Sequence, residues 1–167
     1  KLLDDFSKIK FSVSATTRQP RNGEVNGEDY YFLSMQEFNK KIEENEFLEW
    51  EEFYNGSRYG TLRSEVDKLI ESGYFPLLDI EVKGALNVKR QYGAKSVAIF
   101  IRPPSLEELK KRLVNRGSEN NASLETRLER AEKELTYANE FDFVVINDDL
   151  DTAYKQVTTI VESFITE

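Results

Sequence analysis

The chain has 167 residues, a net charge of −8, no cysteine and no histidine. These features exclude disulfides, thiolate metal sites and histidine acid–base catalysis, and the acidic balance argues against non-specific nucleic-acid binding. No apolar run approaches the roughly 20 residues that span a bilayer, so we expect a cytoplasmic protein without a membrane segment, folded as one domain over residues 1–167. Any metal must bind oxygen ligands, which favours magnesium or calcium.

The first part of the chain predicts short strands and two amphipathic helices. Strands are expected at residues 8–14, 29–34 and 46–53. A helix over 35–45 carries Phe38 and Ile42 at a four-residue spacing, and a helix over 62–73 ends at Gly73, which suits a C-terminal cap. Because tyrosine, phenylalanine, glutamate and glycine are frequent here, we interpret residues 14–73 as an inserted lobe of mixed sheet.

The second part alternates apolar runs with helical patterns. Residues 74–81, 96–101 and 141–147 are near-continuous apolar runs, which are typical of strands buried on both faces of a parallel sheet. Ser105 and Glu108 form a capping box before one helix, Ser123 is placed to cap a helix over 124–139, and a last helix covers 151–165. The order predicts an α/β three-layer fold with its core at 1–13 and 74–167 and a small lid at 112–127.

An unusual set of hydrogen-bond donors lies between residues 11 and 32. Ser14 and Thr16 supply hydroxyls, Arg18 and Arg21 supply planar guanidinium groups, and Tyr30 supplies a phenol. Such donors suit an oxygen-rich dianion, because each charge-assisted bond from arginine contributes about 1.5–3 kcal/mol. A solvated loop with two surface arginines is the alternative interpretation.

Further candidate groups follow along the chain. Glu49, Tyr59 and Thr61 bring a carboxylate, a phenol and a hydroxyl to one stretch, although an edge strand and a turn explain the same residues. Asp79 and Glu81 end an expected strand, where alternation puts them on one face, and helix capping is the other interpretation.

Three arginines surround the expected lid. Arg112 and Arg116 are four residues apart on one helix, and Arg127 follows the polar loop. Such charges usually face solvent, but in an acidic chain they also suit a phosphate.

Five motifs together resemble those of the guanylate kinase family, in family order and over nearly the whole chain. They are "SVSATTRQPRNGEVNGEDYYF", "EFLEWEEFYNGSRYGT", "LLDIEVKGALNVK", "PPSLEELKKRLVNRG" and "VINDDLDTAY". The resemblance implies a P-loop NTPase-like nucleoside monophosphate kinase fold, with a parallel core sheet, a GMP-binding lobe and a lid. It also implies phosphoryl transfer from ATP to GMP, giving ADP and GDP, with ATP as co-substrate and Mg²⁺ accompanying the nucleotide.

The resemblance also implies roles for individual residues. The family's GMP-binding positions are matched by Ser14, Arg18, Arg21, Tyr30, Glu49, Tyr59, Thr61, Asp79 and Glu81. Its ATP-binding positions are matched by Arg116, Arg127 and Asn147, and its catalytic arginines by Arg18, Arg116 and Arg127. The family often has aspartate where this chain has Glu81. No dedicated protein metal site is expected.

One family motif does not occur in the sequence. Guanylate kinases carry a G-x-x-x-x-G-K-[ST] loop that holds the ATP phosphates, and Lys1 falls inside the helix that follows it in the family. We therefore expect the loop to lie upstream of Lys1.

Two other functions stay open at this point. Non-catalytic guanylate-kinase-like modules of scaffold proteins bind phosphopeptides or partner proteins on this fold. A kinase for a different nucleotide is the other alternative, although Glu49 favours guanine. The sequence gives no oligomeric state.

Overall fold

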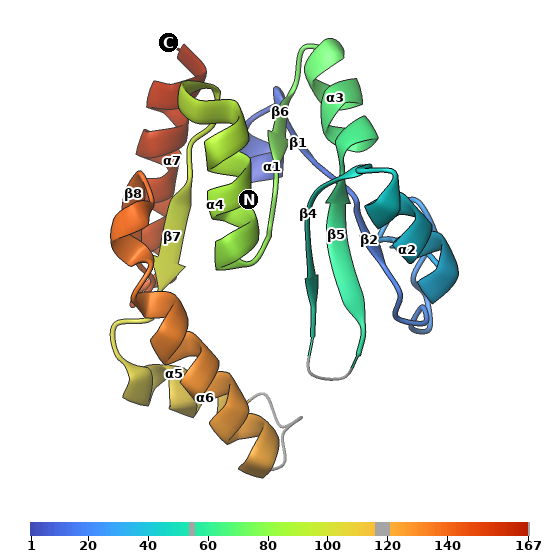
Figure 1. Ribbon diagram of the computed structural model, residues 1–167. Coiled ribbons are helices and arrows are strands. Elements are labelled where there is room, and N and C mark those ends of the chain that lie inside the picture. The colour runs from blue at the N-terminus through green and yellow to red at the C-terminus, as the bar shows by residue number, and fades with distance from the viewer. Residues whose placement is uncertain (54–55, 116–120, 167) are drawn as a thin grey trace. The chain divides into compact units, whose positions relative to one another are not determined.

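The computed structural model describes residues 1–53, 56–115 and 121–166, which form two compact units, Lys1–Tyr92 and Gly93–Glu167 (Figure 1). The first unit contains α1 (Leu2–Asp5), β1 (Ile9–Phe11), β2 (Ser14–Thr16), β3 (Tyr31–Phe32), α2 (Met35–Glu43), β4 (Phe47–Glu52), β5 (Arg58–Leu62), α3 (Arg63–Glu71), β6 (Phe75–Leu77) and α4 (Val82–Tyr92). The second contains β7 (Ile99–Arg102), α5 (Leu106–Asn115), α6 (Asn121–Leu135), β8 (Phe143–Ile146) and α7 (Leu150–Thr166), with short 3-10 turns at Gly93–Lys95 and Ala138–Glu140.

A four-stranded mixed sheet dominates the first unit. Its strand order is β3-β2-β5-β4, with β2 and β3 parallel and the other neighbours antiparallel. The register of β4 against β5 shifts at a bulge, because Phe47 pairs with Leu62 whereas Glu49 pairs with Thr61. This arrangement confirms the mixed sheet that the sequence predicted for the first part of the chain.

Helix α2 covers one face of the mixed sheet (Figure 1). Phe38 of this helix is fully buried, and its ring stacks on that of Phe47 with 4.4 Å between centroids. Ser34 and Glu37 begin the helix with a reciprocal capping box, which satisfies two backbone N–H groups at its end. The apolar core therefore lies between α2 and this face, and leaves the opposite face for other contacts.

A second, parallel pair of strands belongs to the same unit. Strands β1 and β6 pair from Ile9 opposite Phe75 to Phe11 opposite Leu77. Because parallel strands end at the same edge of a sheet, the segments that leave them, toward Ser14 and toward Asp79, begin side by side.

The second unit is built on the parallel strands β7 and β8. Helix α7 contacts β8 and buries Ala153, Val157 and Val161. The strands were expected to be buried on both faces, but among the described residues Ile101, Phe143 and Ile146 are exposed while Phe100 and Val145 are buried. Helices α5 and α6 contact each other as a helical hairpin (Figure 1).

Helix boundaries in this unit match the sequence in one case and differ in another. The hydroxyl of Ser105 accepts a hydrogen bond from the Glu108 N–H at 3.1 Å, so the predicted cap of α5 is confirmed. The predicted cap at Ser123 is wrong, because α6 already begins at Asn121 and Ser123 lies within it.

Candidate functional site

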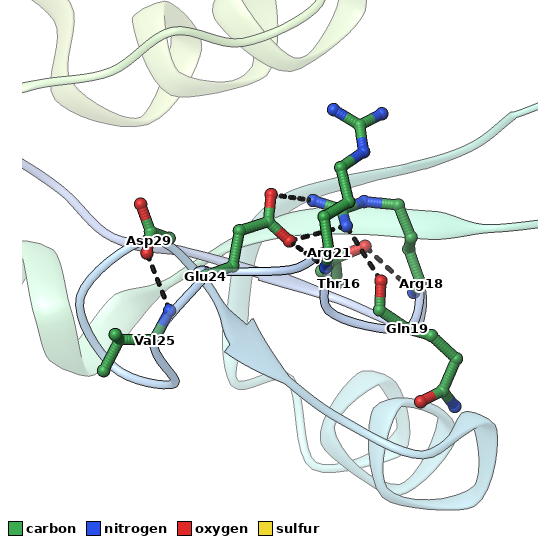
Figure 2. Close-up of polar contacts among 7 residues, drawn as sticks. All are labelled: Thr16, Arg18, Gln19, Arg21, Glu24, Val25 and Asp29. Carbon is green, nitrogen blue, oxygen red and sulfur yellow. Dashed lines mark hydrogen bonds and ion pairs between the residues drawn. The ribbon is translucent and has the colours of Figure 1, made fainter.

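The loop from Thr17 to Tyr30, called here the arginine loop, holds Arg18 in a fixed position (Figure 2). The two terminal nitrogens of the Arg18 guanidinium donate to the two carboxylate oxygens of Glu24 at 2.8 and 2.9 Å. One of these nitrogens also donates to the Gln19 carbonyl at 2.8 Å. The backbone N–H of Arg18 donates to the buried Thr16 hydroxyl at 3.2 Å. A bidentate pair of this kind fixes the plane of a guanidinium as well as its position.

Aromatic rings support the same guanidinium. The Arg18 guanidinium carbon lies 5.2 Å from the centre of the Tyr30 ring and 5.6 Å from that of Phe32. The Tyr30 ring in turn meets the Tyr59 ring edge-on at 5.9 Å. Hydrogen bonds from Arg18 to Glu24 and to Tyr59 raise the pKa of Arg18, so this cation carries its charge at every working pH. The structure thus brings Arg18, Tyr30 and Tyr59 together, as the sequence predicted.

The two arginines of the loop are not equivalent. Arg21 donates its backbone N–H to a Glu24 carboxylate oxygen at 2.6 Å, whereas its side chain is exposed. Figure 2 shows the Arg21 guanidinium directed away from the Glu24 carboxylate. One guanidinium is therefore held in place before any ligand arrives, and the other extends toward solvent.

Glu24 was missing from the set of residues predicted from the sequence. The hydrogen bond from Arg18, with that from the Arg21 backbone, lowers the pKa of Glu24 to about 2, so the carboxylate is ionised at neutral pH. The spacing Arg18-x-x-Arg21-x-x-Glu24 was a visible signal, because a carboxylate near two arginines in a tight loop is well placed to orient one of them.

Glu49 of β4 is a buried carboxylate that is hydrogen-bonded to an uncharged side chain. Its side chain is 6% exposed, and one carboxylate oxygen accepts the hydroxyl hydrogen of Thr61, itself fully buried, at 2.6 Å. Burial raises the pKa of Glu49 and nearby Glu51 adds to the rise, while the hydrogen bonds from Thr61 act in the opposite direction. A desolvated carboxylate with spare acceptor capacity is suited to bind a ligand that offers N–H groups.

Strand pairing places Ser14 in the same cross-strand row as this carboxylate. Ser14 of β2 pairs with Thr61 of β5, and Thr61 pairs with Glu49 of β4. Cross-strand partners point to the same face of a sheet, so these three residues form a row across three neighbouring strands. Two residues further along these strands, Thr16 pairs with Tyr59 on the same face, which links the row to the arginine loop.

Asp79 and Glu81 lie outside any strand. Strand β6 ends at Leu77, so the expectation that alternation puts both acids on one strand face is wrong. Asp79 is exposed, and the Glu81 carbonyl accepts the Ala85 N–H at 2.9 Å, which places Glu81 at the start of α4. Both residues still follow the carboxyl end of β6, which is the edge of the sheet at which the sequence predicted them.

The second unit holds two of the residues expected near ATP. Asn147 directly follows β8, and its backbone N–H donates to the Arg102 carbonyl at 2.8 Å. Arg112 of α5 donates to the Asn147 carbonyl at 2.7 Å and to Glu108 at 2.9 Å, a tether that the sequence did not predict. Arg127 lies in α6. Arg116, and with it the middle of the lid predicted at 112–127, lies outside the described residues.

Metal and membrane sites were also sought in the described part of the chain. Residues 1–53, 56–115 and 121–166 contain no group of three or more acidic, histidine or cysteine side chains placed to hold a metal ion. Within the same residues, no helix combines the length and the apolar character needed to cross a bilayer.

Comparison with known proteins gives consistent matches over the whole chain. The family profile described as guanylate kinase matches residues 1–164. The chain is 50% identical to "Guanylate kinase" of Chlorobaculum tepidum over 98% of this chain and 84% of that protein, and 48% identical to that of Salinibacter ruber over 99% and 87%. A crystal structure of guanylate kinase from Anaplasma phagocytophilum superposes with a TM-score of 0.77 at 32% identity, covering 94% of this chain and 76% of that chain.

Because the charge of Glu49 is buried, we expect the protein to become more stable when that charge is removed. The folded-state pKa of Glu49 is raised, so the native protein holds this proton more tightly than the unfolded chain and loses stability as pH rises through the window between the two values. Glu49→Gln removes that loss and keeps an acceptor for Thr61. We expect the Tm of Glu49→Gln to exceed that of the wild type at pH 8, with a smaller difference at pH 5, in thermal denaturation followed by circular dichroism.

Glu71→Gln is the matched control, because Glu71 is exposed at the end of α3. Its Tm should follow the wild type at both pH values. A Glu49→Gln variant that is less stable than the wild type at pH 8 would show that burial of this charge is not the dominant cost.

Proposed function

The chain belongs to the guanylate kinase family, and we propose on that premise that its arginine loop and its buried Glu49–Thr61 pair together bind GMP. The reaction transfers a phosphoryl group from ATP to GMP and gives ADP and GDP. The observation that supports this site best is the pairing of a desolvated carboxylate with an oriented guanidinium on one mixed sheet, since GMP has a donor-rich base at one end and a dianion at the other.

The arginine loop would bind the GMP phosphate. Arg18 is oriented by Glu24 and by the rings of Tyr30 and Phe32, so little side-chain entropy is lost when it binds an anion. Arg21 extends into solvent and is free to turn toward the phosphate. Ser14, Tyr30 and Tyr59 would add hydroxyl donors around the same oxygens.

Glu49 would select the base. Guanine presents N1–H and N2–H₂ donors on its Watson–Crick edge, and a carboxylate accepts both. Adenine places an unprotonated acceptor at N1, which would leave the desolvated Glu49 carboxylate without partners. Sites that depend on such bonds discriminate by about 10⁴-fold or more. Thr61 would fix the carboxylate and lie near the same base.

Asp79 and Glu81 would complete the GMP site from the carboxyl end of β6. Ligands of open parallel sheets bind at this edge, and β1 leads from the same edge into Ser14. Asp79 is exposed, which suits contacts to ligand hydroxyl and amino groups, whereas Glu81 is half-buried at the start of α4.

Arg127, Arg116 and Asn147 would serve ATP. Phosphoryl transfer requires in-line positioning and positive charge around the moving group, and arginines provide both without histidine or cysteine. Asn147, whose carbonyl is held by Arg112, would lie beside the adenine. Mg²⁺ would neutralise phosphate charge, and it commonly binds through nucleotide phosphates and water with one or two carboxylates. A cytoplasmic location is part of the same proposal.

The first test of this function is turnover. The full-length protein should release ADP from ATP only when GMP is present, in an assay that couples ADP release to NADH oxidation. AMP at the same concentration should give a rate lower by about two orders of magnitude or more, because Glu49 rejects it. Tight GMP binding with no ADP release would instead favour a non-catalytic binding module.

Glu49→Gln is expected to relax base selection. Glutamine offers one acceptor oxygen and an NH₂ donor, so one guanine donor loses its partner while adenine N1 gains one. We predict a GMP KM about tenfold higher or more and a GMP/AMP ratio of kcat/KM reduced by about 100-fold. Steady-state kinetics with both nucleotides measure this, with Glu71→Gln as control. An unchanged GMP/AMP ratio would remove Glu49 from the base site.

Arg18→Ala is expected to weaken GMP by about 2 kcal/mol or more, which is roughly 30-fold in Kd. The variant loses a preoriented cation and leaves the Glu24 carboxylate to repel the phosphate. Isothermal titration calorimetry measures the change, and Arg63→Ala, at the start of α3 and outside the arginine loop, serves as the control arginine. GMP affinity equal to the wild type would mean that the arginine loop does not bind the phosphate.

A further inference from the structure

Gly84 lies against the Glu49 carboxylate. It is the third residue of α4 and is buried. A Cβ atom built on Gly84 would stand 2.5 Å from one Glu49 carboxylate oxygen, 3.0 Å from the carboxylate carbon and 3.1 Å from Cγ. Atoms do not approach so closely without a shift, so the carboxylate occupies the space that any side chain at position 84 would need.

The backbone does not require glycine at this position. Five other glycines of the described chain have a φ in the left-handed region, and Gly84 is not among them. Within a helix, glycine is less stable than alanine by about 0.5–1 kcal/mol, because glycine loses more conformational entropy when the chain folds. The advantage of glycine here is therefore the space that it leaves for Glu49.

Hydrogen bonds restrain both the Glu49 side chain and helix α4. The other carboxylate oxygen of Glu49 accepts from the Thr61 hydroxyl at 2.6 Å, which fixes the side chain on the β5 side. Helix α4 is tied to β4 by a hydrogen bond from the Gln91 amide to the Leu48 carbonyl at 3.2 Å, next to Glu49 in the chain. An added methyl group would thus have to push the carboxylate away from Thr61 or separate α4 from β4.

We propose that Gly84 is a positioning residue for base selection, which sets the place of the Glu49 carboxylate by leaving it the space beside the first turn of α4. The proposal rests on the proposed function, in which Glu49 accepts the guanine donors. It assigns GMP preference to three residues that act as a unit: the Glu49 carboxylate, Thr61 on one side of it, and Gly84 of α4 on the other.

Gly84→Ala is the test in the full-length protein. We expect the GMP KM to rise about tenfold or more, the size of effect produced when a hydrogen bond to a charged group is lost. The GMP/AMP ratio of kcat/KM should fall, while the ATP KM changes less than about twofold. Arg90→Ala in the last turn of the same helix is the control and should leave all three values unchanged. An unchanged GMP KM and GMP/AMP ratio would overturn the proposal.

A thermal cycle tests the contact without any substrate. Glu49→Ala removes the carboxylate, so Gly84→Ala should lower the Tm in the wild-type background and leave it equal or raise it in the Glu49→Ala background. An equal Tm loss in both backgrounds would overturn the proposal, because the methyl group would then collide with something other than Glu49. If Gly84→Ala alone does not fold, recovery of folding in the double variant supports the contact and its absence overturns it.

The two failures are distinguishable. A wild-type protein without GMP turnover defeats the proposed function, whatever the variants do. Wild-type turnover with an unaffected Gly84→Ala variant defeats only the role of Gly84.

Discussion

Burying the Glu49 carboxylate costs free energy, and the arrangement of the residues around it is shaped by that cost. Its observed partner is the hydroxyl of Thr61, which is weaker compensation than a cation, and burial raises the pKa of Glu49 accordingly. A carboxylate in this condition gains more from a ligand that brings two N–H groups than an exposed one would, because little of it is accessible to water. The strand pairing of β4 and β5, the packing of α4 and the glycine at position 84 all act on this one side chain.

In the arginine loop, by contrast, the charged side chain is a cation that has a partner of opposite charge. Arg18 is bonded to the Glu24 carboxylate, so a phosphate that bound there as we propose would meet a charge whose orientation is set but whose hydrogen bonds are partly used. Glu24 thus orients the Arg18 guanidinium and would also compete with a phosphate for it. Glu24 contacts Arg21 through the Arg21 backbone N–H, which leaves the Arg21 guanidinium outside this hydrogen bond. The mixed sheet connects the two ends, since the row from Ser14 to Glu49 crosses β2, β5 and β4.

Sequence reasoning located the residues whose chemistry is visible in their type. The mixed sheet and the anion-binding character of the arginine loop were indicated by the residues themselves, whereas the roles expected for Glu49 and Thr61 came from the resemblance to the guanylate kinase family. Glu24 and Gly84 were not predicted, because their effect is spatial: one orients a neighbour and the other leaves room for one. The end of β6 was placed too late, because the three residues of β1 limit the length of its partner, and apolar character continues beyond Leu77. Helix α4 was not predicted, since Gly84 lowers the helix signal in its first turn.

The bulge in β4 decides which surface the Glu49 carboxylate belongs to. In a regular strand Phe47 and Glu49, two residues apart, would share a face, and the acid would sit in the apolar layer under α2. Because Phe47 pairs with Leu62 and Glu49 with the adjacent Thr61, one extra residue in β4 turns the acid to the opposite side. Deletion of Leu48 would make Phe47 and Glu49 neighbours in a regular strand and so keep them on opposite faces. The bulge therefore accommodates one more buried residue, Leu48, between them without changing the side of the sheet to which Glu49 points.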